Sequence, residues 1–387
     1  MKLARKLIVL ASLTILIVTM IIALPQQAQK PQIIWADYGS LVLTGPIYNP
    51  FYPNTLASDS VTSIMTYAPL ALYNPFNNQF YPVLARNWSI QLLPNGSGIL
   101  TIYLRHGLYW FNGSATIPFT AWDVYAYFYI YVKAFQMYYP YMLPQYADED
   151  IRVINNYTIQ FLLNTYSPYQ VVYILDQVIS TPWSVWKPIV NKLKIMNITQ
   201  AEAYSTNITD FVPPCWYIGQ YYLTYLSSNA RTITLIPSSM LSIWYDVYPL
   251  ASWAYYQPSI TTLWLGTIPG AVAALLSGKA FVTGHWIGFS EKQLEILNSS
   301  GFGSYLIPDF SSWGLFLNPW VYPFNIPKVR QAFCYVFNRT AIAAAWGLNI
   351  PDYYPEPTPS YTVNTYPPDL RKFLIPYSYN LTKAAEL

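Results

Sequence analysis

The sequence LRHGLYWFNGSATIPFTAWDV occupies residues 104–124 and changes its pattern twice. It begins at the end of an apolar segment of the kind found in strands, and Asn112-Gly113 follows as a pair typical of a tight hairpin turn. Thr120 then precedes a helical pattern and has Asp123 three residues beyond it, as expected of a capped helix start. These residues therefore predict a strand, a hairpin and a capped helix in close succession.

Strands and helices alternate along the rest of the chain. Further apolar segments predict strands at residues 32–36, 98–105, 151–163 and 232–236. A 3.6-residue period predicts helices that begin at residues 120, 269 and 328, the last two extending to 277 and 346. Because both kinds of element are mixed throughout and no internal repeat is present, the expected class is α/β, of the mixed α+β kind.

The composition excludes several classes of protein. Of 387 residues, 53% are hydrophobic and only 10% are charged, and 38 Tyr, 14 Trp and 32 Pro are present. Disordered chains are poor in aromatic residues, so a folded protein is expected. The net charge of +3 comes without a basic run, which gives no reason to expect a nucleic-acid partner.

The first thirty residues resemble an export signal. Lys2, Arg5 and Lys6 precede an apolar run over residues 7–24. Two alternatives remain open: cleavage as a signal peptide near residues 23–28, or retention as an N-terminal membrane anchor. In both cases the positive charges at the start place the bulk of the chain outside the cell. An extracellular, surface-associated protein is therefore expected.

Nine Asn-x-Ser/Thr sequons support export, because such sequences are acceptors of N-linked glycans in exported proteins. Asn338 lies inside a helical pattern, and we treat its sequon as accidental; the sequon at Asn380 is the other one outside the candidate set. The candidate glycosylation sites are Asn87, Asn95, Asn112, Asn156, Asn197, Asn207 and Asn298.

No catalytic or metal motif stands out. His106 and His285 have no Cys, His or carboxylate partner at a metal-ligand spacing, so neither a metal nor a cofactor is expected. The acidic run 148–150 is interpreted as a solvated turn, since neighbouring residues cannot all face one cleft. Cys215 and Cys334 leave a disulfide open, although Cys334 fits an apolar helical stripe.

Several ordered motifs resemble family 5 of the extracellular solute-binding proteins, which bind dipeptides and oligopeptides for ABC importers. The stretches that carry the resemblance are YAPLALY at 67–73, YPVLARNW at 81–88, residues 104–124, LFLN at 315–318, KVRQA at 328–332, and residues 377–387 with KAAEL at their end.

This resemblance implies a periplasmic-binding-protein-like clamshell of two lobes that binds without covalent chemistry. Lobe I would comprise residues 31–60 and 181–265, a small subdomain residues 61–180, and an incomplete lobe II residues 266–387. The implied function is capture of peptides, or of oligosaccharides, by a monomer that delivers them to the membrane subunits of an ABC importer. A secreted structural or surface-layer glycoprotein and a secreted glycosidase are the alternatives.

The chain departs from the family pattern in three places. CWYIG at 215–219 replaces the usual GTGPY/F segment, and Phe281 stands where the family often has Asp. The sequence also ends inside the helix expected for the KAAEL motif. We therefore assign no residue of this chain to the α-ammonium group of a peptide ligand. The candidate ligand-binding residues are Tyr48, Asn49, Trp216, Trp313 and Asn318.

Overall fold

A computed structural model gives the structure of the chain and forms two compact units, which are described separately. The first comprises residues 1–266 with 280–282, and the second comprises 267–279 with 283–387. The residues described are 32–37, 47–52, 65–74, 79–138, 141–245, 259–283, 289–304, 315, 317–345, 375 and 377–387. Residues 1–31, with the predicted export segment, lie outside this set.

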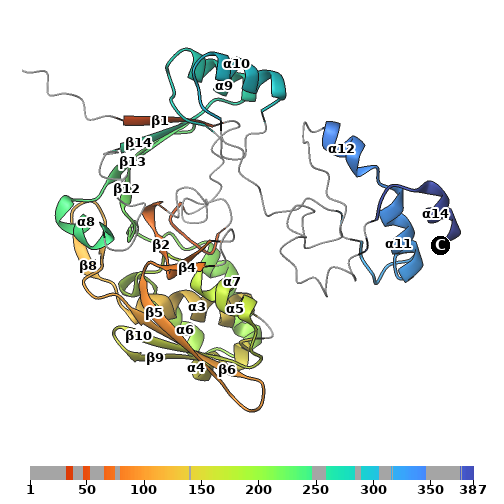
Figure 1. The fold of residues 1–387 in the computed structure, drawn as a ribbon. Coiled ribbons are helices and arrows are strands. Elements are labelled where there is room, and N and C mark those ends of the chain that lie inside the picture. Colours follow the sequence, from red (N-terminus) through yellow and green to blue (C-terminus); the bar gives the residue numbers. More distant parts are fainter. Residues whose placement is uncertain are drawn as a thin grey trace, which may run out of the picture. The chain divides into compact units, whose positions relative to one another are not determined.

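Two four-stranded sheets form the frame of the first unit (Figure 1). One has the order β1-β14-β13-β12, built from Gln32–Asp37, Ser259–Trp264, Ala230–Leu235 and Tyr221–Leu226. The other has the order β5-β6-β10-β9, built from Ala85–Leu92, Gly98–Leu104, Thr158–Leu163 and Ile151–Asn155. In the first sheet β1 runs parallel to β14, whereas the other pairings in both sheets are antiparallel.

Three two-stranded ribbons complete the strands of this unit. They pair β2 with β11, β3 with β4, and β7 with β8. Their bounds are Ala68–Pro69, Val178–Ile179, Ala71–Asn74, Gln79–Pro82, Tyr109–Phe111 and Thr116–Pro118. The β7–β8 ribbon is the hairpin predicted at Asn112-Gly113, and it leads directly into the predicted helix.

Helices of the first unit pack mainly beside the β5-β6-β10-β9 sheet (Figure 1). They are α3 Ala121–Phe135, a 3₁₀ turn at Pro144–Tyr146, α4 Ala147–Asp150, α5 Pro168–Leu175, α6 Trp183–Lys194, α7 Ile198–Thr209 and α8 Ser238–Tyr245. The predicted cap of α3 is confirmed, because Thr120 and Asp123 form a capping box.

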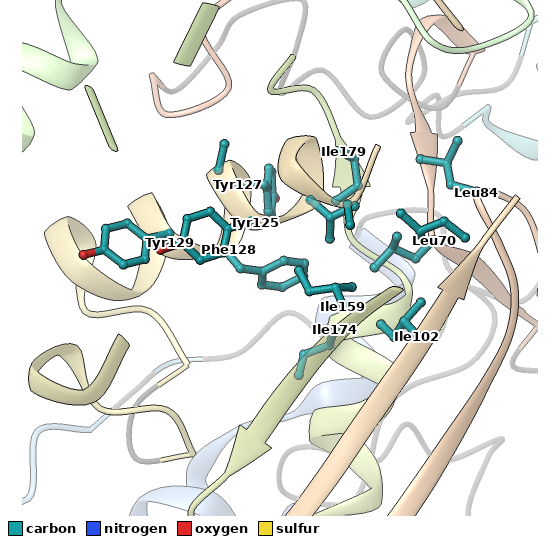
Figure 2. Packing of buried hydrophobic residues seen from close by; sticks show 14 of the residues in the cluster. Leu70, Leu84, Ile102, Tyr125, Tyr127, Phe128, Tyr129, Ile159, Ile174 and Ile179 are labelled. Carbon is teal, nitrogen blue, oxygen red and sulfur yellow. The ribbon is translucent and has the colours of Figure 1, made fainter. Parts of the chain in front are cut away.

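The main core lies between α3 and the sheet beside it (Figure 2). Alternate residues of β10, Ile159, Phe161 and Leu163, are buried and face this core, as the two-residue period of a strand requires. The ring centroids of Phe128 and Phe161 lie 4.8 Å apart in a T-shaped contact. Each fully buried apolar side chain of this size contributes about 2 kcal/mol of transfer free energy.

The strand predicted over residues 151–163 is wrong in its extent, because the chain reverses within it. β9 and β10 form an antiparallel hairpin, and the amide of Tyr157 donates to Oδ1 of Asn155 at 2.9 Å in the turn. Asn side chains stabilise such turns by bonding the backbone two residues on. The apolar pattern on both sides of the turn concealed this break.

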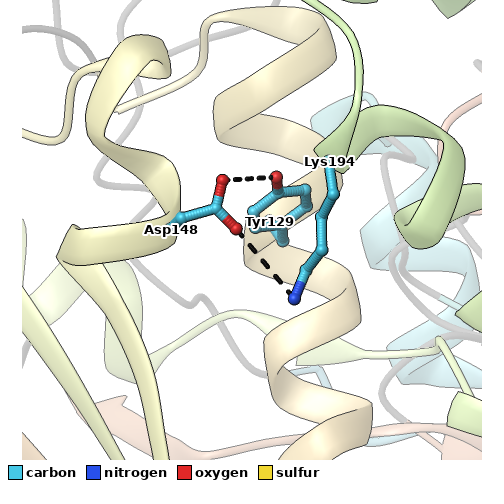
Figure 3. Close-up of polar contacts among 3 residues, drawn as sticks. All are labelled: Tyr129, Asp148 and Lys194. Carbon is cyan, nitrogen blue, oxygen red and sulfur yellow. Dashed lines mark hydrogen bonds and ion pairs between the residues drawn. The ribbon is translucent and has the colours of Figure 1, made fainter.

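The acidic run 148–150 is not a solvated turn throughout. It lies in α4, and Asp150 is 2% exposed, with Oδ2 accepting from Nδ2 of Asn164 at 3.0 Å. Burial raises the pKa of Asp150. Asp148 accepts a 3.0 Å bond from the Tyr129 hydroxyl and lies 4.0 Å from Nζ of Lys194 (Figure 3). Since that ion pair is exposed, it contributes little to stability.

The second unit is helical in its described part. Its helices are α9 Ile268–Leu276, α10 Glu291–Ser299, α11 Pro327–Val336, α12 Arg339–Ala345 and α14 Leu381–Glu386. The helix predicted at 269–277 is confirmed as α9, with Thr267 accepting from the Gly270 amide at 3.2 Å as its cap. Among the residues described, no helix is long and apolar enough to cross a bilayer.

The single helix predicted over 328–346 is wrong, because two helices cover it. Phe337 is extended, with ψ at 116°, and ends α11. Oδ1 of Asn338 then accepts from the Ala341 amide at 3.0 Å and starts α12. Nη1 of Arg339 donates to the Cys334 carbonyl at 2.9 Å, which satisfies an oxygen that the break leaves without a helical partner.

Candidate ligand-binding site

The CWYIG segment is held by backbone hydrogen bonds on two sides. Tyr217 exchanges two bonds with Phe111 of β7, at 2.7 and 2.8 Å. The amides of Ile218 and Gly219 both donate to the Thr66 carbonyl, at 3.1 and 2.8 Å. The backbone of the segment therefore joins the β7–β8 ribbon to residues 65–67.

Gly219 is the closest point of this joint. A Cβ atom at this position would collide with the backbone oxygen of Met65 and would lie 2.7 Å from the Thr66 carbonyl carbon and the Tyr67 oxygen. Such distances are well below carbon contact distances, and the neighbouring atoms are backbone rather than mobile side chain. The position therefore requires glycine because two chain segments approach there.

Three tyrosines gather on the segment and form what we call the tyrosine cluster: Tyr48, Tyr67 and Tyr217. The Tyr48 and Tyr217 rings meet edge to face with centroids 6.2 Å apart, and the Tyr67 and Tyr217 centroids are 6.0 Å apart. The polar ends of the Tyr48 and Tyr217 side chains lie close to each other and to the Cys215 thiol. Tyr67 and Tyr217 are buried, whereas Tyr48 and Cys215 remain half-exposed.

The cluster is electrically neutral at physiological pH. Burial is the main cause that raises the pKa of Tyr48, of Tyr67 and of Tyr217 above the ordinary value of a phenol. Burial likewise raises the pKa of the Cys215 thiol. The cluster therefore offers hydroxyl groups and aromatic faces without charge, which suits polar, uncharged ligand groups.

Two of the predicted ligand-binding residues lie at this site. Tyr48 belongs to the cluster, and Trp216, which is half-buried, lies between Cys215 and Tyr217 in the clamped segment. They are 168 residues apart in the sequence, which therefore did not indicate that they lie close together. The contact between Tyr48 and Cys215 joins them in space.

Asn49 is fully buried directly beside Tyr48. Its Nδ2 donates to the carbonyls of Ile208 at 2.6 Å and Phe211 at 2.8 Å, and to that of Thr209 at 3.2 Å. Its Oδ1 accepts from the Phe51 amide at 2.9 Å. In this structure Asn49 thus satisfies the last carbonyls of α7 and places Tyr48 beside the segment that follows this helix.

The remaining two predicted residues belong to the second unit. Asn318 is exposed, and its Oδ1 accepts from the Trp320 amide at 3.0 Å in a local turn. Trp313 lies outside the described residues. Their part in ligand binding stays a prediction.

The sequence alone did not indicate that Tyr67 and Tyr217 belong to this cluster. The departure of residues 215–219 from the family pattern was a usable signal, but it pointed to Trp216 as readily as to its neighbour Tyr217. Tyr67 lies inside the YAPLALY motif, where it resembled one more core aromatic. In the described part of the chain no cluster of His, Cys, Asp and Glu could hold a metal, and both Cys215 and Cys334 are free thiols.

Comparison with known proteins gives the family. Residues 258–387 match the family described as bacterial extracellular solute-binding proteins, family 5 middle. The match covers about a third of the chain and makes this part similar to the family 5 solute-binding proteins. The family inferred from the motifs is therefore confirmed. No curated protein is a significant match to the chain.

Solved structures show the same fold over most of the chain. A Thermotoga maritima periplasmic oligopeptide-binding protein, solved with mannohexaose, matches with a TM-score of 0.65 and 21% identity over 92% of this chain and 61% of its own. DppA of Helicobacter pylori, in complex with the peptide STSA, has a TM-score of 0.59 at 20% identity, over 92% and 65%. AppA of Bacillus subtilis, in complex with a nonapeptide, has 0.56 at 17%, over 92% and 63%.

These matches confirm the mixed α/β class and the fold of two-lobed periplasmic binding proteins. The chain spans slightly less than two thirds of the length of each of these solved relatives. The comparisons do not favour a structural glycoprotein or a glycosidase.

Proposed function

We propose that the chain is the substrate-binding component of an ABC importer and captures oligopeptides or oligosaccharides outside the cell. The fold carries this proposal, since 92% of the chain matches solved binding proteins of such importers. Binding would be non-covalent, and ligand contacts made only in a closed arrangement would drive closure. The membrane subunits of the importer would be its protein partner, and the chain would act as a monomer.

The tyrosine cluster supports a ligand rich in neutral polar groups. The hydroxyl of half-exposed Tyr48 can donate to carbonyl or sugar oxygens, and the half-buried ring of Trp216 can stack on sugar rings or apolar side chains. Both classes of ligand present such groups. Only 10% of the residues of the chain are charged, so the composition gives no reason to expect a strongly charged ligand.

The organisation expected from the family belongs to this proposal. Residues 31–60 and 181–265 would form lobe I, residues 61–180 its small subdomain, and residues 266–387 the part of lobe II in this chain. Residues 1–30 would export the protein, either as a cleaved signal or as an anchor. An exported chain would also be open to N-linked glycosylation at its seven candidate sequons.

Isothermal titration calorimetry of the purified protein tests the ligand class. The panel would contain di- to nonapeptides alongside cello-, xylo- and manno-oligosaccharides. We expect one of the two classes to bind with micromolar or tighter affinity, a free energy of about −8 kcal/mol or lower. If neither class binds to correctly folded protein, the proposal is wrong.

Two variants test the site itself. We expect Trp216→Ala and Tyr217→Phe each to weaken binding by about tenfold. The first variant lacks an aromatic ring that can contact the ligand, and the second lacks a hydroxyl group in the side chains that support the site. Tyr169→Phe is the matched control, because Tyr169 is 85% exposed on α5. Unchanged affinity in both site variants would place the ligand elsewhere.

A further inference from the structure

The nine sequons of this chain differ sharply in the structures that hold them. Transfer of an N-linked glycan requires an enzyme to bind the acceptor Asn together with the Ser or Thr two residues after it. In a folded protein both residues must therefore be exposed, and their backbone must be free to leave its hydrogen bonds. These requirements can be compared site by site.

Asn112 meets them best. Residues 112–116 are all exposed and form the tip of the β7–β8 ribbon. Oδ1 of Asn112 accepts from the Ser114 amide at 3.0 Å, the Ser114 hydroxyl at 3.2 Å and the Ala115 amide at 2.7 Å. These bonds turn the carboxamide oxygen into the loop, and no described residue accepts a bond from Nδ2. The reactive nitrogen is therefore presented to solvent.

Glycine makes this tip accessible. Gly113 has a φ of +100°, which permits the sharp turn, and no atom lies within 4 Å of where its Cβ would be. The space next to the Gly113 backbone at this tip is therefore open.

Helices hold five of the other sequons. Asn207 and Asn298 lie within α7 and α10, and the hydroxyl of Ser300 donates to the Ile296 carbonyl at 2.8 Å. The other three are helix caps, accepting from amides of the first turn: Asn197, Asn338 and Asn380. A transferase could use these sites only after part of a helix unwinds.

The last three sequons belong to the β5-β6-β10-β9 sheet: Asn87 lies in a strand, and Asn95 and Asn156 lie in the turns of its hairpins. Asn87 lies within β5, paired with β6. The sequon of Asn95 ends at Ser97, which is only 4% exposed, whereas Ser114 in the sequon of Asn112 is exposed. Asn156 is followed by Tyr157, whose ring stacks on His106 at 3.9 Å. In each case at least one residue of the sequon is buried or lies in a paired strand.

We propose that Asn112 is the site at which the folded chain accepts an N-linked glycan. Nδ2 of Asn112 would form a bond to the anomeric carbon of a lipid-pyrophosphate-linked oligosaccharide. The bond between that carbon and the pyrophosphate oxygen would break, and the amide proton would pass to a base of the transferase. The inference rests on the proposed export of the chain to a compartment that holds such a donor.

The test compares the folded full-length chain with nine synthetic peptides, each containing one sequon. Both are incubated with a purified oligosaccharyltransferase and its lipid-linked donor, and glycopeptide mass spectrometry gives the initial rate at each Asn. The peptides report the intrinsic acceptor quality of each sequon. We expect Asn112 to keep its peptide rate within about threefold, whereas Asn207 and Asn298 fall by about tenfold or more.

Asn112→Gln and Ser114→Ala should each abolish glycan transfer at Asn112. Ser97→Ala, which removes the sequon of Asn95, should leave transfer at Asn112 unchanged. Circular dichroism confirms that these variants are folded. Equal or faster transfer at Asn207 or Asn298 in the folded chain, or none at Asn112, overturns the inference. Because the reaction uses no importer ligand, its result is independent of the calorimetric test of function.

Discussion

Asn49 shows how one buried side chain organises the site. Two of its amide donations go to the last two residues of α7 and the third to Phe211 just beyond the helix, and its oxygen accepts from the Phe51 amide. The adjacent hydroxyl of Tyr131 donates to the Pro50 carbonyl at 3.0 Å, which ties the same segment to α3. Residue-scale polar contacts of this kind, rather than apolar packing alone, set the position of Tyr48.

Substitutions at Asn49 should be among the most destabilising single changes in the chain. Asn49→Ala leaves buried carbonyls without donors, and we expect a loss of about 2 kcal/mol. Asn49→Asp places a carboxylate against those carbonyls, and we expect a loss of about 4 kcal/mol. Urea unfolding measures both. Asn87→Asp, at an exposed strand position, is the control and should change stability by less than about 0.5 kcal/mol.

Asp123 should make stability depend on pH. Burial raises its pKa from 3.8 to about 7, even though its carboxylate accepts from the amides of Trp183 at 2.6 Å and Thr120 at 2.5 Å. Between pH 4 and 7 the folded protein retains a proton that the unfolded chain has lost. Stability should therefore fall as pH rises through this window, by up to about 4 kcal/mol.

The comparison with Asp123→Asn isolates this effect. The variant is less stable overall, because its amide faces a backbone donor, but its free energy of unfolding should lack this contribution to the pH slope. Urea denaturation at half-unit intervals from pH 4 to 7.5 gives both slopes. Parallel curves for the two proteins would show that Asp123 is ionised throughout the window.

At the scale of elements, the site lies where three short pieces of backbone meet: the β7–β8 ribbon, the segment after α7 and the loop at residues 65–67. The β7–β8 ribbon supplies Phe111, the segment after α7 supplies Tyr217, and residues 65–67 supply the Thr66 carbonyl. None of these elements is large, and each is held by backbone bonds to another. The geometry therefore depends on close approach of the backbones, which only glycine at position 219 permits.

Gly219→Ala should open this joint. The added methyl cannot occupy its position without moving residues 65–67, and we expect a loss of about 3 kcal/mol together with weaker ligand binding. Gly96→Ala is a useful control: φ there is +81°, but the space around it is open, so only backbone strain of about 1 kcal/mol is expected. Equal losses in the two variants would show that the close contact at Gly219 relaxes easily.

For the whole molecule, the two units differ in how deeply their described helices are buried. Twelve of the fifteen residues of α3 are buried, whereas α11 buries only Tyr335 and α14 buries none. Helix stability in proteins comes mostly from packing of a buried face. The helix α3 should therefore be held more firmly than α11 and α14.

Hydrogen exchange monitored by mass spectrometry tests this difference. We expect amides of α3 to exchange only through global unfolding, and those of α11 and α14 to exchange at least about 100-fold faster through local opening. Equal protection of α3 and α11 in the free protein would contradict the expectation.

Local signals in the sequence identified much of the fold. Thr120 with Asp123 predicted the start of α3, Asn112-Gly113 predicted the ribbon turn, and the apolar period predicted α9. The errors came where a local polar residue interrupts an apolar pattern. Asn155 reverses the chain inside a predicted strand, and Asn338 restarts a helix inside a predicted helix, because side-chain caps act over three or four residues and leave the hydrophobic period almost unchanged.

By itself, the sequence determined the family, the mixed α/β class and the local turns and caps, since motifs and short-range hydrogen bonds are written in neighbouring residues. Only the tertiary structure decided which aromatics meet. Tyr48, Tyr67 and Tyr217 resemble many other tyrosines of this chain, and their neutral cluster arises from contacts between residues far apart in sequence. Tertiary structure likewise separates Asn112 from eight sequons of equal local quality, because exposure and backbone freedom are properties of the folded chain.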